Sequence, residues 1–305
     1  MAKRRRGSCS KSTPSTTEES KATYKTLSTT ASGFRARVLK NGIILDPDSK
    51  PPANLADLRA RLNRDGGKKT MTTKSAYEDY VTIVQQTAGE QDLVVRTSHR
   101  LLKEFNDKSY QPHFNQTFTA LEKDVGFNNG LSPARPDFVE GFGPEQFRPF
   151  PVAQKLHGKA VLTNEGENSI TLPHLAGEWK RPNDGLALAG LQSAYYGAIL
   201  VYARKQALEY LGDPDPLGNA FVCTFATNGK SINFFAHYAA PSKINKKKME
   251  YHQYLIRSLV LTTSYEDFKD ARRQLQNLQD FAREQSVALK TRLIDYWRLK
   301  CDPGV

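Results

Sequence analysis

Apolar positions are sparse at the start of the chain and become periodic further along. Residues 1–50 are rich in Ser, Thr and Lys and contain few apolar side chains, too few to offset the entropy lost when a chain is ordered. We therefore predict a disordered basic tail over residues 1–50, with a short extended piece at residues 36–48. Apolar side chains at helical spacing after Asn54 and again after Ser75 predict accessory helices within residues 51–100.

Residues 101–245 combine helical segments with short strand-like ones. Apolar spacing predicts helices at residues 98–105 and 113–126. A longer segment, residues 186–212, is apolar on most of its circumference and predicts a buried helix. An Asn-Gly pair at residues 228–229 is typical of a hairpin turn. Short β-branched or aromatic stretches bounded by Gly, Asn and Pro predict strands at residues 135–142, 159–165, 167–180, 219–229 and 230–239.

The C-terminal part of the chain returns to a helical pattern. Residues 265–297 carry apolar side chains at helical spacing. We therefore expect residues 246–305 to form helices that pack on the core. The order of helices, strands, buried helix and strands indicates an α/β or α+β core over residues 101–245.

Composition and charge narrow the choice of partner. Of the 305 residues 38% are hydrophobic, which is enough for a core, and the formal net charge is +12 with a pI near 9.5. This balance favours a polyanionic partner such as nucleic acid or an acidic membrane surface. Cys9, Cys223 and Cys301 lie far apart, without metal-ligand spacing, so neither a disulfide framework nor a zinc site is predicted.

The start of the chain bears on localisation. It is basic but lacks the apolar segment of a signal peptide, and no later run reaches the length of a membrane span. We therefore expect an intracellular protein that does not insert into a membrane. The cluster from Lys3 to Arg6 has two interpretations, a nuclear-import element or the solvated end of a disordered tail.

Three charged residues occur where the surrounding pattern is that of core strands. Asp137 follows a proline, and Glu178 and Lys180 are separated by one residue in an otherwise apolar segment. Because alternate residues of a strand point to the same face, Glu178 and Lys180 lie together. Burying an acid beside a base is costly unless a ligand uses them. Two carboxylates that hold Mg²⁺, with an ammonium beside the ion, are suited to hydrolysis of a phosphodiester.

These residues resemble a known signature. The Pro-Asp pair that ends at Asp137, together with the Glu-Trp-Lys run from Glu178 to Lys180, resembles the motif of the PD-(D/E)XK nuclease superfamily. Gln192 and Tyr196 resemble the Gln-x-x-x-Tyr element of its RecB-like and phage exonuclease branches, and residues four apart share one face of a helix. The resemblance implies a three-layer α/β restriction-endonuclease-like core, a mixed sheet flanked by helices, with accessory N- and C-terminal helices.

The resemblance also implies an activity. Residues 75–297 as a whole resemble a group of fungal proteins placed in this superfamily. The implied protein is a nuclease that acts on DNA or RNA with Mg²⁺, or with Mn²⁺ in its place. Asp137 and Glu178 would hold the metal, and Lys180 would orient water or stabilise charge. Gln192 and Tyr196 would place the scissile strand.

A third acid and a histidine complete the candidate site. Members of the superfamily usually add an acidic residue from a helix before the sheet, and the helix predicted at residues 113–126 offers Glu122, with Glu104 behind it. His174 lies on the same predicted strand as Glu178 and faces either the site or the core. We favour a structural role for His174, because metal nucleases of this type need no histidine base.

Two other functions fit the same residues. A nuclease-like fold that cleaves nothing could serve as a nucleic-acid-binding, effector or toxin-type interaction module, since fold does not fix function. A structural protein could bind nucleic acid through charge alone. In each case basic runs at residues 243–252 and 269–276 would supply phosphate contacts whose strength falls as salt rises.

Overall fold

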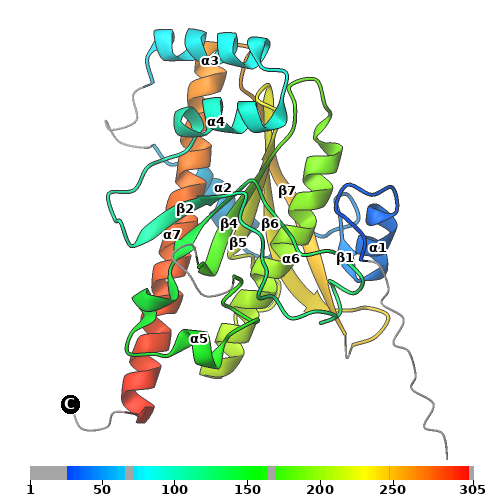
Figure 1. Cartoon of the computed structure of the whole chain (residues 1–305), viewed down its shortest axis with the longest axis vertical. Helices are drawn as coiled ribbons and strands as arrows, with labels where there is room; N and C mark the ends of the chain where they lie inside the picture. Colours follow the sequence, from blue (N-terminus) through cyan, green and yellow to red (C-terminus); the bar gives the residue numbers. More distant parts are fainter. Residues whose placement is uncertain (1–25, 66–71, 164–168, 247, 302–305) are drawn as a thin grey trace, which may run out of the picture.

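A seven-stranded sheet forms the centre of the described part of the chain, which in this computed structural model comprises residues 26–65, 72–163, 169–246 and 248–301 (Figure 1). Its spatial order is β1-β7-β6-β5-β4-β3-β2. The β1/β7 and β4/β5 pairs are parallel and the other pairs are antiparallel, so the sheet is mixed. The strands are β1 (Ile43–Ile44), β2 (Tyr110–Phe114), β3 (Phe138–Phe142), β4 (Thr171–Trp179), β5 (Val222–Thr227), β6 (Ser231–Pro241) and β7 (Met249–Val260).

Helices cover both faces of this sheet (Figure 1). One face packs on α6, and the other packs on α7, against which α2, α3 and α4 lie. The arrangement is a three-layer α/β fold, as the sequence predicts. The helices are α1 (Phe34–Lys40), α2 (Leu55–Leu62), α3 (Lys74–Gln86), α4 (Glu90–Leu101), α5 (Val152–Lys155), α6 (Leu186–Leu211) and α7 (Tyr265–Cys301), with a short 3₁₀ helix at Pro144–Phe147.

Helix α6 is the buried helix expected from its apolar circumference. It ends at Gly212, whose φ of 69° is a left-handed cap that favours glycine. A side chain at Gly197 would have its Cβ only 2.1 Å from Nδ1 of His237 on β6, so the helix approaches the sheet closely at this point. Among the described helices α6 is long and apolar enough to cross a membrane, but 78% of its apolar window is buried inside the fold. It therefore serves as a core helix.

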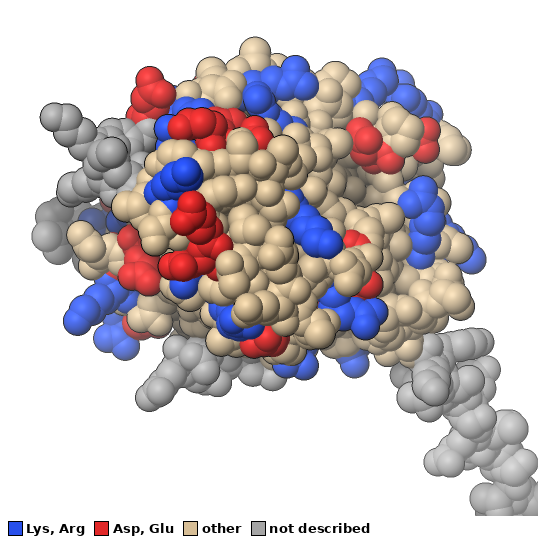
Figure 2. Space-filling view, turned by 90° about the horizontal axis from the view of Figure 1, so that it is seen from above, with Lys and Arg blue, Asp and Glu red and all other residues tan. Residues whose placement is uncertain are grey.

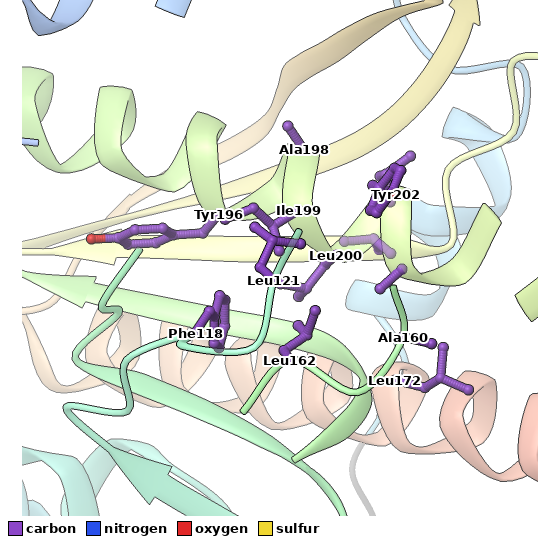
Figure 3. Close-up of a cluster of buried hydrophobic side chains, with 14 of the residues drawn as sticks. Phe118, Leu121, Ala160, Leu162, Leu172, Tyr196, Ala198, Ile199, Leu200 and Tyr202 are labelled. Atoms are coloured by element: carbon purple, nitrogen blue, oxygen red, sulfur yellow. The ribbon is translucent and has the colours of Figure 1, made fainter. Parts of the chain in front are cut away.

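The face between α6 and the sheet holds a large cluster of apolar side chains (Figure 3). Ile199 and Leu200 of α6 meet Leu172 of β4 there. Phe118 and Leu121 join the same cluster from the loop after β2. The cluster fixes α6, and hence the side chains of its N-terminal half, relative to β4.

The N-terminal segment departs from the prediction. Residues 26–50 are ordered in the structure, because Phe34 and Val38 share one face of α1 and are buried with Ile43 of β1. The predicted disorder is wrong for this part. Together with Leu45, these residues make four scattered apolar side chains, and they suffice to dock a segment of polar composition. Residues 1–25, including the cluster from Lys3 to Arg6, lie outside the described residues.

Two elements predicted within the core do not form. Residues 113–126 are not a helix: β2 ends at Phe114, and the following loop bonds to other loops through Phe118 N to Ala134 O (2.9 Å) and Ala120 N to Leu162 O (3.1 Å). The strand predicted at residues 159–165 is reduced to isolated bridges at Val161 in its described part. Several apolar side chains of these segments, among them Phe118, Leu121 and Val161, are buried without regular structure.

The sheet also extends beyond the expected core of residues 101–245. Strand β7 lies within residues 246–305, where only helices were predicted, and its side chains do not alternate regularly between buried and exposed. Strand β1 reaches the same sheet edge from the N-terminal side by pairing with β7. The predicted helices α2, α3, α6 and α7 and the β5–β6 hairpin are present.

Candidate metal centre at the end of strand β4

Strands β3 and β4 bring Asp137 and Glu178 together. The strands are antiparallel with Phe138 opposite Gly177, so the next step of the register places Asp137 beside Glu178. Asp137 Oδ2 accepts a hydrogen bond of 2.7 Å from the backbone N–H of Trp179, which holds the carboxylate at the end of β4. Both acids are buried, with 5% of Asp137 and 3% of Glu178 exposed. The structure thus brings together the two acids predicted as metal ligands.

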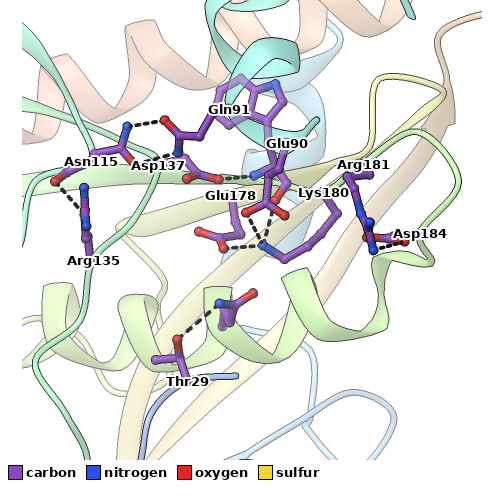
Figure 4. Close-up of polar contacts among 12 residues, drawn as sticks. Thr29, Glu90, Gln91, Asn115, Arg135, Asp137, Glu178, Lys180, Arg181 and Asp184 are labelled. Carbon is purple, nitrogen blue, oxygen red and sulfur yellow. Dashed lines mark hydrogen bonds and ion pairs between the residues drawn. The ribbon is translucent and has the colours of Figure 1, made fainter. Parts of the chain in front are cut away.

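Glu90 supplies a third carboxylate. It is the first residue of α4, after the N-cap Gly89, and 35% of its side chain is exposed. Glu90, Asp137 and Glu178 each present a ligand oxygen within 4.8 Å of the other two (Figure 4). Hard cations such as Mg²⁺, Mn²⁺ and Ca²⁺ take carboxylate oxygens at about 2.0–2.6 Å, so the three groups can share one ion.

Lys180 lies beside these acids, as its spacing from Glu178 predicts. Its Nζ is 2.7 Å from Glu178 Oε1 and 3.2 Å from Glu90 Oε1, and it donates to the carbonyl of Trp179 at 2.8 Å (Figure 4). The ammonium is nearly buried. One cation is therefore held among three carboxylates, and the group keeps an excess of negative charge when all of them are ionised.

Burial perturbs the pKa of Asp137, Glu178 and Lys180. Burial raises the pKa of Asp137 to about 6, although the Trp179 N–H and Lys180 act to lower it. Burial and the neighbouring Asp137 raise the pKa of Glu178 to about 8, against the opposing effect of Lys180. Burial acts to lower the pKa of Lys180, but Glu178 and the other carboxylates raise it above its ordinary value. A bound cation would relieve this repulsion.

One oxygen of Glu178 is evidence that this group of acids binds a ligand. Glu178 Oε2 is buried and makes no hydrogen bond of standard geometry with a described residue, although the Tyr196 hydroxyl lies near this carboxylate. Buried polar atoms are nearly always paired, and an unpaired carboxylate oxygen costs more than a neutral atom would. This Glu178 oxygen and the convergence of three carboxylates fit a hard divalent cation.

Gln192 and Tyr196 approach this group from α6, and both are buried. The Tyr196 hydroxyl donates to the carbonyl of Arg135 at 3.3 Å. Burial raises its pKa well above the ordinary value, and the charges of Glu178 and Asp137 add to the effect. The helix therefore places a neutral phenol next to the acids.

The N-terminal segment contacts the site through Gln192. Gln192 Nε2 donates to Thr29 Oγ1 at 3.3 Å, while Gln192 Oε1 is buried without a partner among the described residues. Thr29 is held in place by its neighbour Leu27, whose N–H donates to the carbonyl of Gly130 at 3.0 Å. The N-terminal segment therefore contacts one of the candidate site residues through Thr29.

Glu122 does not occupy the position expected of it. The helix that was to carry it does not form, and Glu122 Oε2 instead accepts a hydrogen bond of 3.3 Å from the hydroxyl of Tyr202. Glu104 is exposed in the loop before β2. Glu90 takes the place of both among the described acids. Glu90 stands directly after the N-cap Gly89, where an acidic residue is common at the start of any helix, so the sequence held no specific signal for it.

His174 has the structural role favoured for it. Its Nε2 accepts from Arg204 Nη1 at 3.0 Å, so its Nδ1 carries the proton and donates to Ser286 Oγ at 2.8 Å. Burial lowers its pKa well below the ordinary value, and the charge of Arg204 adds to this. His174 thus stays neutral and joins β4 to α6 and α7.

Comparison with known proteins gives a family for this arrangement. A search of curated proteins found no match to the chain. Residues 81–289, more than half of the chain, match the family described as "Domain of unknown function (DUF7924)". All three carboxylates, Lys180, Gln192 and Tyr196 lie in this range, whereas Thr29 precedes it. The chain therefore belongs to the DUF7924 family.

Proposed function

We propose that the protein is a metal-dependent nuclease that hydrolyses phosphodiester bonds of DNA or RNA. The observation that carries the proposal is the convergence of Glu90, Asp137 and Glu178 within 4.8 Å, with the Lys180 ammonium 2.7 Å from Glu178. Structural ion pairs seldom gather three carboxylates around one buried ammonium, because the excess charge destabilises the fold. A functional site that uses these acids explains why the fold tolerates the stability lost by burying them.

Glu90, Asp137 and Glu178 would hold Mg²⁺ or Mn²⁺. When bound, such an ion neutralises charge on the phosphate and makes a water molecule more acidic. The fit rests on the oxygen-only donor set and on Oε2 of Glu178, which makes no hydrogen bond of standard geometry with a described residue. The Trp179 N–H keeps Asp137 Oδ2 oriented, so that its other oxygen is available.

The remaining residues have separate roles in this proposal. Lys180 is placed to orient the attacking water or to stabilise negative charge that develops on the phosphate, since its Nζ already lies beside two of the acids. Tyr196 and Gln192 are carried by α6 and would position the scissile strand. The neutral Tyr196 hydroxyl can donate to a phosphate oxygen without adding charge.

Sequence likeness supports the same reading. The order of Asp137, Glu178, Lys180, Gln192 and Tyr196 is that of the PD-(D/E)XK signature with its Gln-x-x-x-Tyr element, and the three-layer fold is compatible with it. Nucleic acid is the implied partner. An intracellular location, with import into the nucleus through the basic N-terminal cluster, is part of the proposal.

Cleavage assays test the proposal. Short DNA and RNA substrates are incubated with the full chain in Mg²⁺, Mn²⁺ or EDTA. We expect cleavage with a divalent ion only, and its loss in Glu178→Gln and in Glu90→Gln. Glu122→Gln removes the same charge outside the site and should cleave like the wild type. Equal activity of Glu90→Gln and the wild type would refute the assigned third acid.

A second candidate function is supported by the burial of the site. Only 5% of Asp137 and 3% of Glu178 are exposed, and Lys180 is paired with two acids. Such a self-paired cluster is what a nuclease-like binding module that cleaves nothing would retain. This alternative requires wild-type protein that binds nucleic acid but does not cleave it with any divalent ion. It also requires Glu178→Gln to leave that binding unchanged.

A further inference from the structure

A large cleft lies between α1, the C-terminal half of α6 and the β6–β7 turn. Its volume is about 1160 Å³. Arg37 and Lys40 line it from α1, Lys205 from α6 and Lys248 from the turn. Glu250 is the one acidic residue among the described lining residues. The cleft is therefore basic, in a part of the fold that the proposed metal centre does not use.

The basic residues of this cleft differ in whether they already pair with other residues of the protein. Lys205 pairs with Glu209 on α6, and Arg37 Nη1 donates to the carbonyl of Asn129 at 3.3 Å. Lys40 and Lys248 are exposed and make no ion pair with a described residue. These two ammonium groups are available to an anionic ligand.

Other basic positions are less available. In the run of residues 269–276, Lys269 pairs with Glu266, and Arg272 donates to the carbonyl of Arg100 at 2.6 Å. On the face at the α3 and α4 end of the molecule, Lys and Arg are interspersed with Asp and Glu (Figure 2). A mixed surface of this kind attracts a polyanion weakly. The cleft beside α1 is the stronger candidate.

Exposed apolar side chains accompany the cations of the cleft. Leu39 of α1 is 41% exposed and Ile244 of the β6–β7 turn is 97% exposed. Single-stranded nucleic acid is bound by grooves that combine cations for the phosphates with apolar or aromatic surface for the bases. The bases of a duplex are stacked inside it and would leave these two side chains in water.

Helix α6 borders both the cleft and the metal centre. Tyr196 belongs to the centre and Lys205 to the cleft, and they are about 13 Å apart along the helix axis at roughly 1.5 Å per residue. A second connection runs through the N-terminal segment, in which Thr29 bonds to Gln192 and α1 carries Lys40 into the cleft. A strand of a few nucleotides can cover this distance.

We infer that the cleft binds single-stranded nucleic acid outside the metal centre. Phosphates contact Lys40 and Lys248, and bases pack on Leu39 and Ile244. The choice of nucleic acid over an acidic peptide rests on the proposed function, because a strand that reaches the metal centre must carry phosphodiesters. The cleft then holds the part of the strand that is not being cleaved.

Binding without metal tests this inference separately from cleavage. A fluorescent oligothymidylate of about 16 nucleotides is titrated with the full chain in EDTA, and the anisotropy is measured at several salt concentrations. The charge-reversal variant Lys40→Glu with Lys248→Glu should bind about tenfold more weakly, and the slope of log K against log salt should fall by about 0.7 for each lost phosphate contact. Lys74→Glu with Lys108→Glu makes the same charge change at exposed positions elsewhere and should keep the wild-type slope.

A second variant tests the apolar contacts. Ile244→Ser replaces a side chain that is almost wholly exposed, so the fold should not be affected. It should weaken binding of the oligothymidylate and leave the salt slope unchanged, since no phosphate contact is lost.

Several results would overturn the inference. These are wild-type affinity in the Lys40 and Lys248 variant, binding of a duplex as tight as that of the single strand, and equal competition by polyglutamate at the same charge concentration. The two proposals can fail separately. Suppose that binding in EDTA depends on Lys40 and Lys248 but no metal supports cleavage. This result would refute the proposed nuclease activity and would support binding of single strands in the cleft. Cleavage by the wild type, with binding unchanged in these variants, would support the nuclease activity and refute binding in the cleft.

Discussion

Glu140 gives the folded protein a pH-dependent stability that one substitution should remove. It lies on β3 and is buried on the α7 side of the sheet. Its Oε2 accepts from Nε2 of Gln279 on α7 at 2.9 Å. Its Oε1 makes no hydrogen bond of standard geometry with a described residue, although the Tyr110 hydroxyl lies near the carboxylate. Burial raises its pKa from the ordinary 4.5 to about 8, although the Gln279 amide acts to lower it.

The sign of the effect follows from proton binding. The folded state keeps a proton on Glu140 up to about pH 8, whereas the unfolded chain releases it near 4.5. The stabilisation is therefore complete below pH 4.5 and is lost as pH rises through 8. At about 1.36 kcal/mol per pKa unit, Glu140 alone lowers the free energy of unfolding by roughly 3 kcal/mol between pH 5 and pH 8.

Glu140→Gln should abolish this dependence. Glutamine has the same shape, carries no charge and keeps an oxygen that can accept from Gln279. In urea unfolding the variant should be more stable than the wild type at pH 8, by an amount that shrinks towards pH 5. Glu104→Gln, which removes a carboxylate from the surface, is the control and should follow the wild type. If the difference between variant and wild type is the same at both pH values, Glu140 is not protonated in the folded protein.

Two further perturbations test the packing of α6 and of the N-terminal segment. Gly197→Ala should lower the free energy of unfolding by about 1–3 kcal/mol, because the added Cβ overlaps with His237 and outweighs a helix-propensity gain of at most about 1 kcal/mol. Gly185→Ala, with nothing within 4 Å of its Cβ, is the matched control in chemical denaturation, and an equal effect of both variants would contradict the close approach. Deleting residues 1–25 should leave the melting temperature unchanged, whereas deleting residues 1–45 removes buried apolar side chains worth about 1.5–3 kcal/mol each and should lower it by several degrees. Equal melting temperatures of the two truncated forms would show that α1 and β1 do not stabilise the core.

Periodicity predicted the elements whose environment is uniform. The middle of α6 is apolar around its circumference because it is buried there, and α7 keeps a helical pattern over its whole length. The apolar spacing of residues 113–126 wrongly predicted a helix, because it too reflects only which side chains are buried. Phe118 and Leu121 are buried, but the surrounding loops pack around them and supply the backbone hydrogen bonds that a helix would have made. Spacing records that side chains are buried and cannot by itself identify the backbone that buries them.

Strand β7 and the segment of residues 26–50 were missed for a different reason. Residues 26–50 contain few apolar side chains. In β7 apolar side chains are common, but they do not alternate regularly with polar ones, so the local pattern of a strand is missing. Both are ordered through contacts with distant parts of the chain, in particular the pairing of Ile43 with Tyr251. Long-range pairing of this kind overrides local propensity.

Some residues of the candidate site could be recognised from local sequence, and others depend on long-range contacts. Glu178 and Lys180 could be found from sequence because charged residues in an apolar strand are costly and call for an explanation. Glu90 could not, because an acidic residue in the first turn of a helix is favoured by the helix dipole and needs no further reason. Its place beside the other two acids is set by how α4 docks, where Trp179 Nε1 donates to Thr97 Oγ1 at 3.3 Å. The candidate metal centre therefore depends on a contact between helix and strand that leaves no motif, and the half-exposed Glu90 is the acid whose position is set by α4.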